Sequence, residues 1–313
     1  MEDRMFIIYG AGNKGRAYLQ LLRRYNLDNR IQCFCDRDAL LIRNIDAIPV
    51  VSYQEAVSMG IPFIIAVRNE KAEEVVSRLK NDKKEFYAGL DKLLVDELHL
   101  MPRIDYEREI CAISHIDTMD QYFEIAESEG ALDFFWSAGG ICRGLFDRLD
   151  LQNTVELACG RGRHVPRYIN SAGHITLVDI LEKNIDLCRM RFSGTDKISY
   201  VVNNGCDLSA LPSEYYTSLF TYDSMVHFEL LDISNYLKET YRILRPGGKA
   251  LFHHSNNDSD YKASYDNAAE SRSFMSKNIF AYLAYRAGFE IEDQRIVDWV
   301  EPEIDCLTLV VKR

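Results

Sequence analysis

Two segments of this chain place a glycine-rich turn between an apolar run and a helix-like stretch. In the first, FIIY precedes GAGNKG, and Asp36 closes the next apolar run, IQCFC. In the second, NTVEL precedes ACGRG, and Asp179 closes HITLV. Glycines at such a turn let the main chain approach a ligand closely, and strands that alternate with helices form parallel sheets with crossover helices. The sequence therefore predicts an α/β protein with two mostly parallel sheets.

The chain has 313 residues, more than one ordinary domain of roughly 100–200 residues needs. The first strand–helix pattern stops near residue 95, and the following stretch to about 150 indicates helices with little strand character. We expect residues 1–95 to form a small Rossmann-like domain of nucleotide-binding type. Residues 96–150 are expected to form a helical bridge, and residues 151–313 a second Rossmann-like domain.

Composition excludes several classes of protein. Lys and Arg number 37 against 48 Asp and Glu, so the formal net charge of −11 disfavours nucleic acid as a partner. No run approaches the roughly 20 apolar residues of a membrane span, and the start does not resemble a signal peptide, so we expect a cytoplasmic protein. The eight cysteines are scattered without a C-x-x-C pair, and we expect reduced thiols and no metal site.

In the second half, polar residues recur where strand-like runs end. NNGCDL supplies Asp207 and Leu208, and TYDSMVHF supplies Asp223 and His227, before the turn in RILRPGG. Ligands of open α/β sheets bind outside the carboxyl ends of the strands. These residues are therefore expected to converge on one site with the Gly160–Gly162 loop.

As a set, ELACGRG, Asp179, the Asp-Leu pair, DSMVHF and RILRPGG resemble class I S-adenosylmethionine-dependent methyltransferases over residues of about 130–313. The resemblance implies a seven-stranded Rossmann-like methyltransferase sheet that binds S-adenosyl-L-methionine. It implies that Glu156, Gly160 and Gly162 contact or shape the site of the methionine end of the cofactor. It also implies that Asp179 binds the ribose and that Asp207 and Leu208 flank the adenine. Asp223 is expected at the same site.

This half departs from the family pattern at Ala158, where the family often has its first glycine, which we read as a mild change. The competing interpretation is a nicotinamide dinucleotide fold. That fold needs a small third glycine over a pyrophosphate, and the chain has Val165 there.

The first loop, with Gly10, Gly12, Gly15 and Asp36, matches the spacing G-x-G-x-x-G of a dinucleotide site. About 95 residues leave no room for a full dinucleotide domain with a catalytic half, however. With IIYGAGNKGRAY, CFCDRD and IPVVSYQEA, the segment resembles the N-terminal nucleotide-binding domain of bacterial nucleotide-sugar acyltransferases. That resemblance implies that the loop and Asp36 bind a nucleotide sugar. The alternative is a Rossmann-like docking module that has no ligand.

Methyl transfer to a hydroxyl group needs a base with a pKa near the working pH, and histidine fits this requirement. His227 lies one turn beyond Asp223, and we expect both at the reaction centre. His253 and His254 are adjacent on a strand, so their side chains point to opposite faces and at most one meets the acceptor; we assign His254. Arg272, in a long polar loop, is expected to bind a phosphate or carboxylate.

These features predict an S-adenosylmethionine-dependent methyltransferase that O-methylates a sugar or nucleotide-linked sugar in surface polysaccharide biosynthesis. Oligomers are compatible with the sequence. One alternative is a methyltransferase of another small metabolite with a non-binding N-terminal docking module. A second is a catalytically silent nucleotide-binding protein, and a third is an oxidoreductase that uses the first loop.

Overall fold

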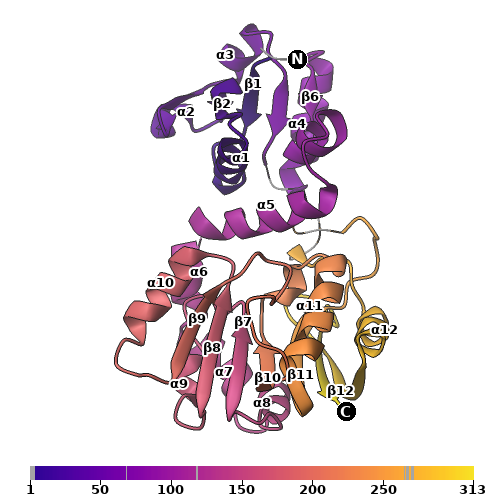
Figure 1. The fold of residues 1–313 in the computed structure, drawn as a ribbon. Coiled ribbons are helices and arrows are strands. Elements are labelled where there is room, and N and C mark those ends of the chain that lie inside the picture. Colours follow the sequence, from indigo (N-terminus) through magenta and orange to yellow (C-terminus); the bar gives the residue numbers. More distant parts are fainter. Residues whose placement is uncertain (1–3, 68, 118, 264, 266–267, 269–270) are drawn as a thin grey trace. The chain divides into compact units, whose positions relative to one another are not determined.

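The computed structural model describes residues 4–67, 69–117, 119–263, 265, 268 and 271–313 (Figure 1). The chain divides into two compact units, Met1–Met119 and Asp120–Arg313. The helices expected between residues 96 and 150 are shared between these units. Helix α5 (Arg103–Asp117) lies in the first unit, α6 (Met119–Ala126) begins at the boundary, and α7 (Glu129–Trp136) and α8 (Ile141–Phe146) lie in the second.

The first unit contains a six-stranded sheet. Its strands are β1 (Phe6–Tyr9), β2 (Ile31–Cys35), β3 (Asn44–Ile45), β4 (Ile48–Val51), β5 (Phe63–Ile65) and β6 (Phe86–Tyr87). Its other helices are α1 (Asn13–Arg24), η1 (Asp28–Arg30), α2 (Ala39–Ile42), α3 (Tyr53–Ser58), α4 (Asn69–Asn81) and η2 (Lys92–Glu97).

The strand order of this sheet is β3-β4-β2-β1-β5-β6, and every neighbouring pair except β3–β4 is parallel. Alternate residues of β1 point to opposite faces of the sheet. Ile8 packs in a core with α1 and α5, whereas Ile7 packs with α3 and α4. Because β1 lies between β2 and β5, the strand order reverses at β1, and the glycine loop follows it at this switch point. Open α/β sheets bind ligands at such a position.

The second unit contains a seven-stranded sheet. Its strands are β7 (Asn153–Leu157), β8 (His174–Asp179), β9 (Ile198–Val202), β10 (Tyr216–Thr221), β11 (Leu244–Ser255), β12 (Phe289–Val297) and β13 (Asp305–Lys312). The remaining helices are α9 (Val165–Tyr168), α10 (Glu182–Arg191), η3 (Met225–His227), α11 (Leu230–Ile243) and α12 (Lys277–Ala287).

The order of the second sheet is β12-β13-β11-β10-β7-β8-β9, with β13 antiparallel to both neighbours and the other pairs parallel. The predicted seven-stranded Rossmann-like sheet is confirmed. The order reverses at β7, which lies between β8 and β10 (Figure 1). The carboxyl ends of these three strands therefore meet at one switch point.

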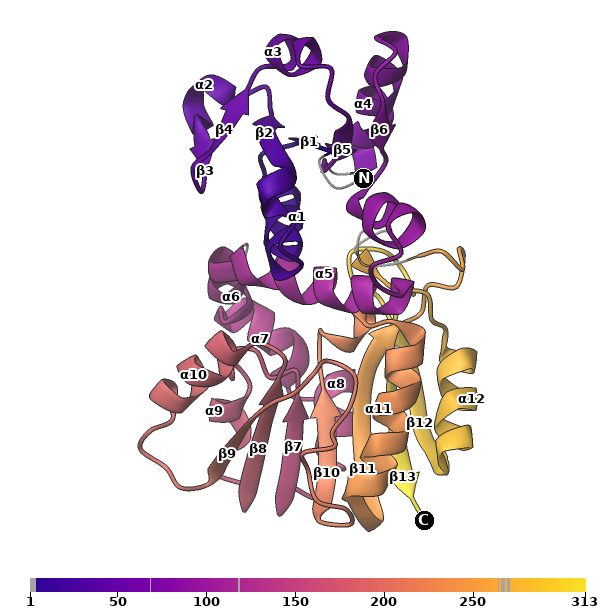
Figure 2. The same ribbon diagram turned by 45° about the horizontal axis from the view of Figure 1, so that its top comes forward.

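Both faces of this sheet are covered by helices. Phe220 of β10 packs in a core with α7, α8, α9 and α10, whereas its neighbour Leu219 packs with α11 and α12 on the opposite face (Figure 2). All six residues of β10 are buried, including the polar residues Thr217, Ser218 and Thr221, as expected for a central strand that is covered on both faces. Among the described residues, no helix combines the length and apolar character that a membrane span requires.

Candidate functional site

The loop after β7 depends on left-handed main-chain conformations. The φ angles are 55° at Gly160 and 72° at Gly162. A Cβ atom at Gly160 would lie 2.9 Å from the ring of Phe123, and one at Gly162 would lie 2.6 Å from Phe192. Ala158 is also left-handed, with φ 56°, so the alanine that we read as a mild change is strained.

Asp179, at the end of β8, supports this loop. Its carboxylate accepts hydrogen bonds from the main-chain N–H groups of Gly160 (2.8 Å) and Leu181 (2.9 Å) and from the amide of Asn184 (3.2 Å). Burial raises the pKa of Asp179 to about 6 against these hydrogen bonds. A carboxylate offers about four acceptor positions, so a ribose hydroxyl can still be accommodated.

Asp223 follows β10 with a left-handed φ of 56°. Its Oδ2 accepts hydrogen bonds from the Tyr122 hydroxyl (2.7 Å) and from Arg163 Nη2 (2.9 Å). Burial acts to raise the pKa of this carboxyl group, but the Arg163 guanidinium and the Tyr122 hydroxyl contribute in the opposite direction, and the pKa lies below its usual value. Asp223 is therefore ionised and paired with a cation, which suits it to bind a positive group rather than to remove a proton.

Asp207 and Leu208 line a cavity of about 230 Å³ near the carboxyl ends of β8 and β9. The Asp207 carboxylate accepts hydrogen bonds from Ser209 N (2.9 Å) and from the Asn204 amide (2.7 Å), and these contacts lower its pKa. The volume is several times the roughly 30 Å³ that one water molecule occupies. The cavity is thus open to a small heterocycle.

Glu156, inside β7, is completely enclosed. Tyr168 of α9 donates a hydrogen bond of 2.6 Å to its carboxylate, and burial raises the Glu156 pKa to about 7 in spite of that contact. The side chain fixes α9 beneath the loop. In this structure it shapes the site from within the core.

His227 lies in η3, four residues beyond Asp223. Its Nδ1 is 2.8 Å from the carbonyl oxygen of Ser271, and its ring packs edge-on against Tyr265. A carbonyl accepts but does not donate, so the Nδ1 atom carries the proton and Nε2 carries the lone pair.

The adjacent histidines of β11 point to opposite faces, as predicted, but our choice between them does not fit the structure. His254 is fully buried, stacks on Phe280 of α12 at 3.9 Å, and lies 2.9 Å from the Thr308 hydroxyl. Burial lowers the His254 pKa to about 3. His254 is a core residue, and His253 is the member that contacts Asp223.

Arg272 also differs from expectation. Its guanidinium is 4% exposed and donates hydrogen bonds of 2.9 and 2.6 Å to the two oxygens of Asp305. Arg272 binds a carboxylate, as the chemistry predicts, but the carboxylate belongs to β13 of the same chain. A substrate anion would have to displace a fully buried partner.

In the first unit, the three glycines of GAGNKG have different surroundings. A Cβ atom at Gly15 would lie 2.0 Å from the Gly10 carbonyl oxygen, and one at Gly10 would lie 2.5 Å from the Ala66 carbonyl oxygen. At Gly12 a Cβ atom would meet nothing within 4 Å. Asp36 accepts hydrogen bonds from Ala11 N (2.8 Å) and Asp38 N (3.0 Å), so it supports the loop.

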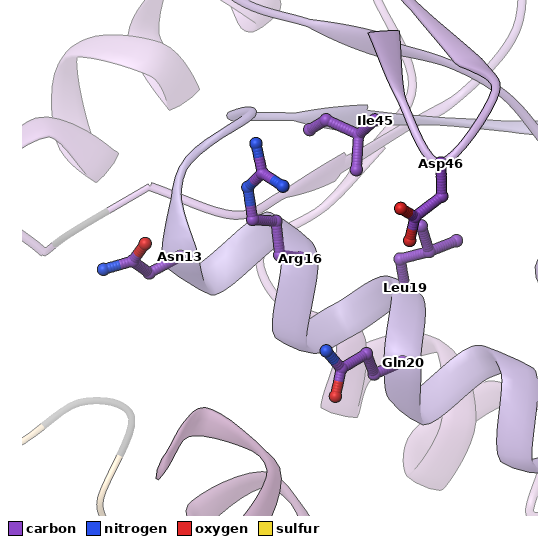
Figure 3. Close-up of a pocket in the computed structure, with 6 residues that line it drawn as sticks. All are labelled: Asn13, Arg16, Leu19, Gln20, Ile45 and Asp46. Carbon is purple, nitrogen blue, oxygen red and sulfur yellow. The ribbon is translucent and has the colours of Figure 1, made fainter. Parts of the chain in front are cut away.

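A cavity of about 380 Å³ lies beside the first turns of α1. Figure 3 shows the residues that line it: Asn13, Arg16, Leu19, Gln20, Ile45 and Asp46. Arg16 brings positive charge to this hollow, and Asp46 is neutralised by Arg23 at 2.7 Å. The cavity is thus polar, with its cation one turn beyond Gly12.

Sequence reasoning missed Tyr122 and Arg163, and it named His253 only as the alternative to His254. Arg163 directly follows Gly162 and could have been found from that position alone. Tyr122 reaches Asp223 across 101 residues of sequence, so no local pattern marks it. Within the described part of the chain, no three side chains among His, Cys, Asp and Glu gather as metal ligands would.

Comparisons with known proteins agree with this geometry. Residues 155–252, which contain the loop, Asp179 and Asp223, match the family model of a methyltransferase domain. The second unit therefore carries a methyltransferase domain with the Rossmann-like fold of that class. No curated protein sequence matches the chain.

Similar solved structures include an S-adenosylmethionine-dependent methyltransferase from Mesorhizobium loti, with 16% identity and a TM-score of 0.45. That match covers 55% of this chain and 97% of the other. Another, from Clostridium acetobutylicum, has 14% identity and a TM-score of 0.47, and covers 62% of this chain and 98% of the other.

Proposed function

We propose that the second unit uses S-adenosyl-L-methionine to methylate a small molecule. The observation that carries the proposal is the meeting of the Gly160–Gly162 loop with Asp179 and the Arg163–Asp223 ion pair at the switch point of the sheet. The methionine end of the cofactor bears an ammonium and a carboxylate. An Asp and an Arg that pair with one another offer a complementary partner for each charge.

In this arrangement Asp223 binds the ammonium and Arg163 the carboxylate of the methionine end. Asp179 accepts a ribose hydroxyl, and the cavity beside Asp207 and Leu208 receives the adenine. Glu156 holds α9 in place below the loop. These residues fit the cofactor because each polar group of the cofactor has a partner of suitable charge or hydrogen-bonding capacity among them.

The bound cofactor supplies an electrophilic methyl group on a sulfonium. The residues of this chain orient the acceptor against it, an effect worth on the order of 7–11 kcal/mol in favourable cases. His227 accepts the proton of an acceptor hydroxyl at Nε2, because its Nδ1 proton is directed at the Ser271 carbonyl. Asp223 stays ionised throughout, and His254 takes no part.

We propose a sugar or nucleotide-linked sugar as the acceptor and surface polysaccharide biosynthesis as the setting. Support comes from the first unit, where Gly12 leaves open space for a phosphate and Arg16 places a cation one turn away. The alternative is another small metabolite, with the first unit as a docking module. A catalytically silent nucleotide-binding protein is the second alternative.

Calorimetric titration of the full chain with S-adenosylhomocysteine tests the proposal. We expect binding by the wild type and a loss of about 10-fold in affinity for Asp223→Asn, since hydrogen bonds to charged groups contribute ~1.5–3 kcal/mol. Gly12→Val, in the other unit, is the matched control and should bind normally. Absence of heat with the wild type would exclude cofactor binding.

A second titration with nucleotide sugars tests the first unit. Because a side chain at Gly12 meets open space, Gly12→Val should keep the fold and block the ligand. Here Asp223→Asn serves as the control. If the wild type binds none of a nucleotide-sugar panel, the docking-module alternative is preferred.

A further inference from the structure

We infer that His253 is a positioning residue of the methyl-transfer site, one that acts through the main-chain N–H of Asp223. The inference rests on the proposed function. The Asp223 N–H donates a hydrogen bond of 3.0 Å to His253 Nδ1. His253 lies on β11, one strand away from the end of β10 where Asp223 is located.

The imidazole is held in one tautomer. Since Nδ1 accepts a hydrogen bond, the proton of the neutral ring lies on Nε2. That atom is 3.3 Å from Asp305 Oδ2, and Asp305 is fully buried. Arg272 neutralises Asp305 through two hydrogen bonds, so the buried charge is paired. Tyr222 stacks on the ring with a centroid distance of 4.7 Å and an interplanar angle of 23°.

This arrangement supports an unfavourable main-chain conformation. A non-glycine residue with φ of 56° costs free energy and persists only where its surroundings hold it. The hydrogen bond to His253 gives the Asp223 N–H a partner in that conformation. It thereby directs the Asp223 carboxylate toward Tyr122 and Arg163, where the ammonium of the cofactor is proposed to bind.

Two substitutions at one position separate this role from packing. In His253→Asn the side-chain oxygen lies close to the place of Nδ1 and can still accept from Asp223 N–H. In His253→Gln the amide reaches the place of Nε2 and the acceptor at Nδ1 is lost. Both variants remove the ring and its stacking on Tyr222, so each controls for the other.

We expect calorimetry with S-adenosylhomocysteine to give an affinity within about 3-fold of wild type for His253→Asn and at least about 10-fold weaker for His253→Gln, the loss of one buried hydrogen bond. Equal affinities for the two variants, whether both normal or both weak, would overturn the inference. His254→Gln serves as a comparison, because it should lower the melting temperature without weakening binding.

Hydrogen exchange gives a second readout that needs no cofactor. The Asp223 amide should be protected in the wild type and in His253→Asn and should exchange faster in His253→Gln, measured at residue resolution. If the wild type binds no S-adenosylhomocysteine, the proposed function fails and this exchange pattern still decides the role of His253. Equal protection in all three proteins would contradict the role.

Discussion

The carboxyl group of Glu156, a residue of β7, is completely buried. Its pKa in the folded state is about 7, above the ordinary value of 4.5, because burial disfavours the charged form. Between these pH values the folded state binds more protons than the unfolded state. The contribution of protonated Glu156 to the free energy of unfolding is therefore fully present below pH 4.5 and is lost as the pH rises through 7. At 1.36 kcal/mol per pKa unit the change is on the order of 3 kcal/mol.

Glu156→Gln should remove this titration and keep an acceptor for the Tyr168 hydroxyl. We expect the free energy of unfolding in urea to fall less between pH 5 and pH 8 for the variant than for the wild type. Asp179, whose pKa is also raised, titrates in both proteins, so the difference isolates Glu156. Identical pH profiles would show that the Glu156 carboxyl does not titrate in this range.

Ala158 gives a second prediction for a single residue. Its φ of 56° is a conformation that disfavours a Cβ atom by roughly 1–2 kcal/mol, whereas glycine adopts it readily. Glycine also loses more entropy on folding, so Ala158→Gly should stabilise the protein by about 0.5–1 kcal/mol. Thermal melting checks this, and Ala158→Val should change the melting temperature in the opposite direction.

At the scale of elements, the junction of β1 with α1 depends more on Gly15 than on Gly12. A Cβ atom at Gly15 would collide with the Gly10 carbonyl oxygen at 2.0 Å, and main-chain atoms cannot move aside cheaply. We expect Gly15→Ala to destabilise the first unit by about 2–4 kcal/mol, in the range of severe steric substitutions. Gly12→Ala, with open space around it, should change stability by less than about 1 kcal/mol. Similar denaturation midpoints for both variants would contradict this reading of the loop.

At the scale of the whole molecule, each unit has hydrophobic cores of its own. The buried clusters of the first unit comprise residues between Phe6 and Ile113, and those of the second comprise residues between Leu132 and Val310. A unit with its own core is expected to fold by itself. We therefore expect a fragment of residues 119–313 to melt cooperatively and to bind S-adenosylhomocysteine with an affinity within about 3-fold of the full chain. An unfolded fragment would show that the second unit depends on the first.

Much of the fold was predictable because the signals are local. Apolar runs, glycine turns and the carboxylates that close the strands lie within short stretches of sequence. They led to two Rossmann-like sheets and to the placement of Asp179 and Asp223 at strand ends. The number of seven strands in the second sheet was implied by the resemblance to class I methyltransferases. Alternation along a strand likewise predicted that His253 and His254 point to opposite faces.

The sequence alone determined which residues lie at the ends of strands, because residue spacing sets strand geometry. Only the tertiary structure decided what those residues contact. Arg272 pairs with Asp305 across 33 positions, and Tyr122 reaches Asp223 across 101. His254 packs against Phe280 of α12, and His253 is the histidine that contacts Asp223. Such partners come from segments far apart in the chain, and their selection is a property of packing that residue spacing does not encode.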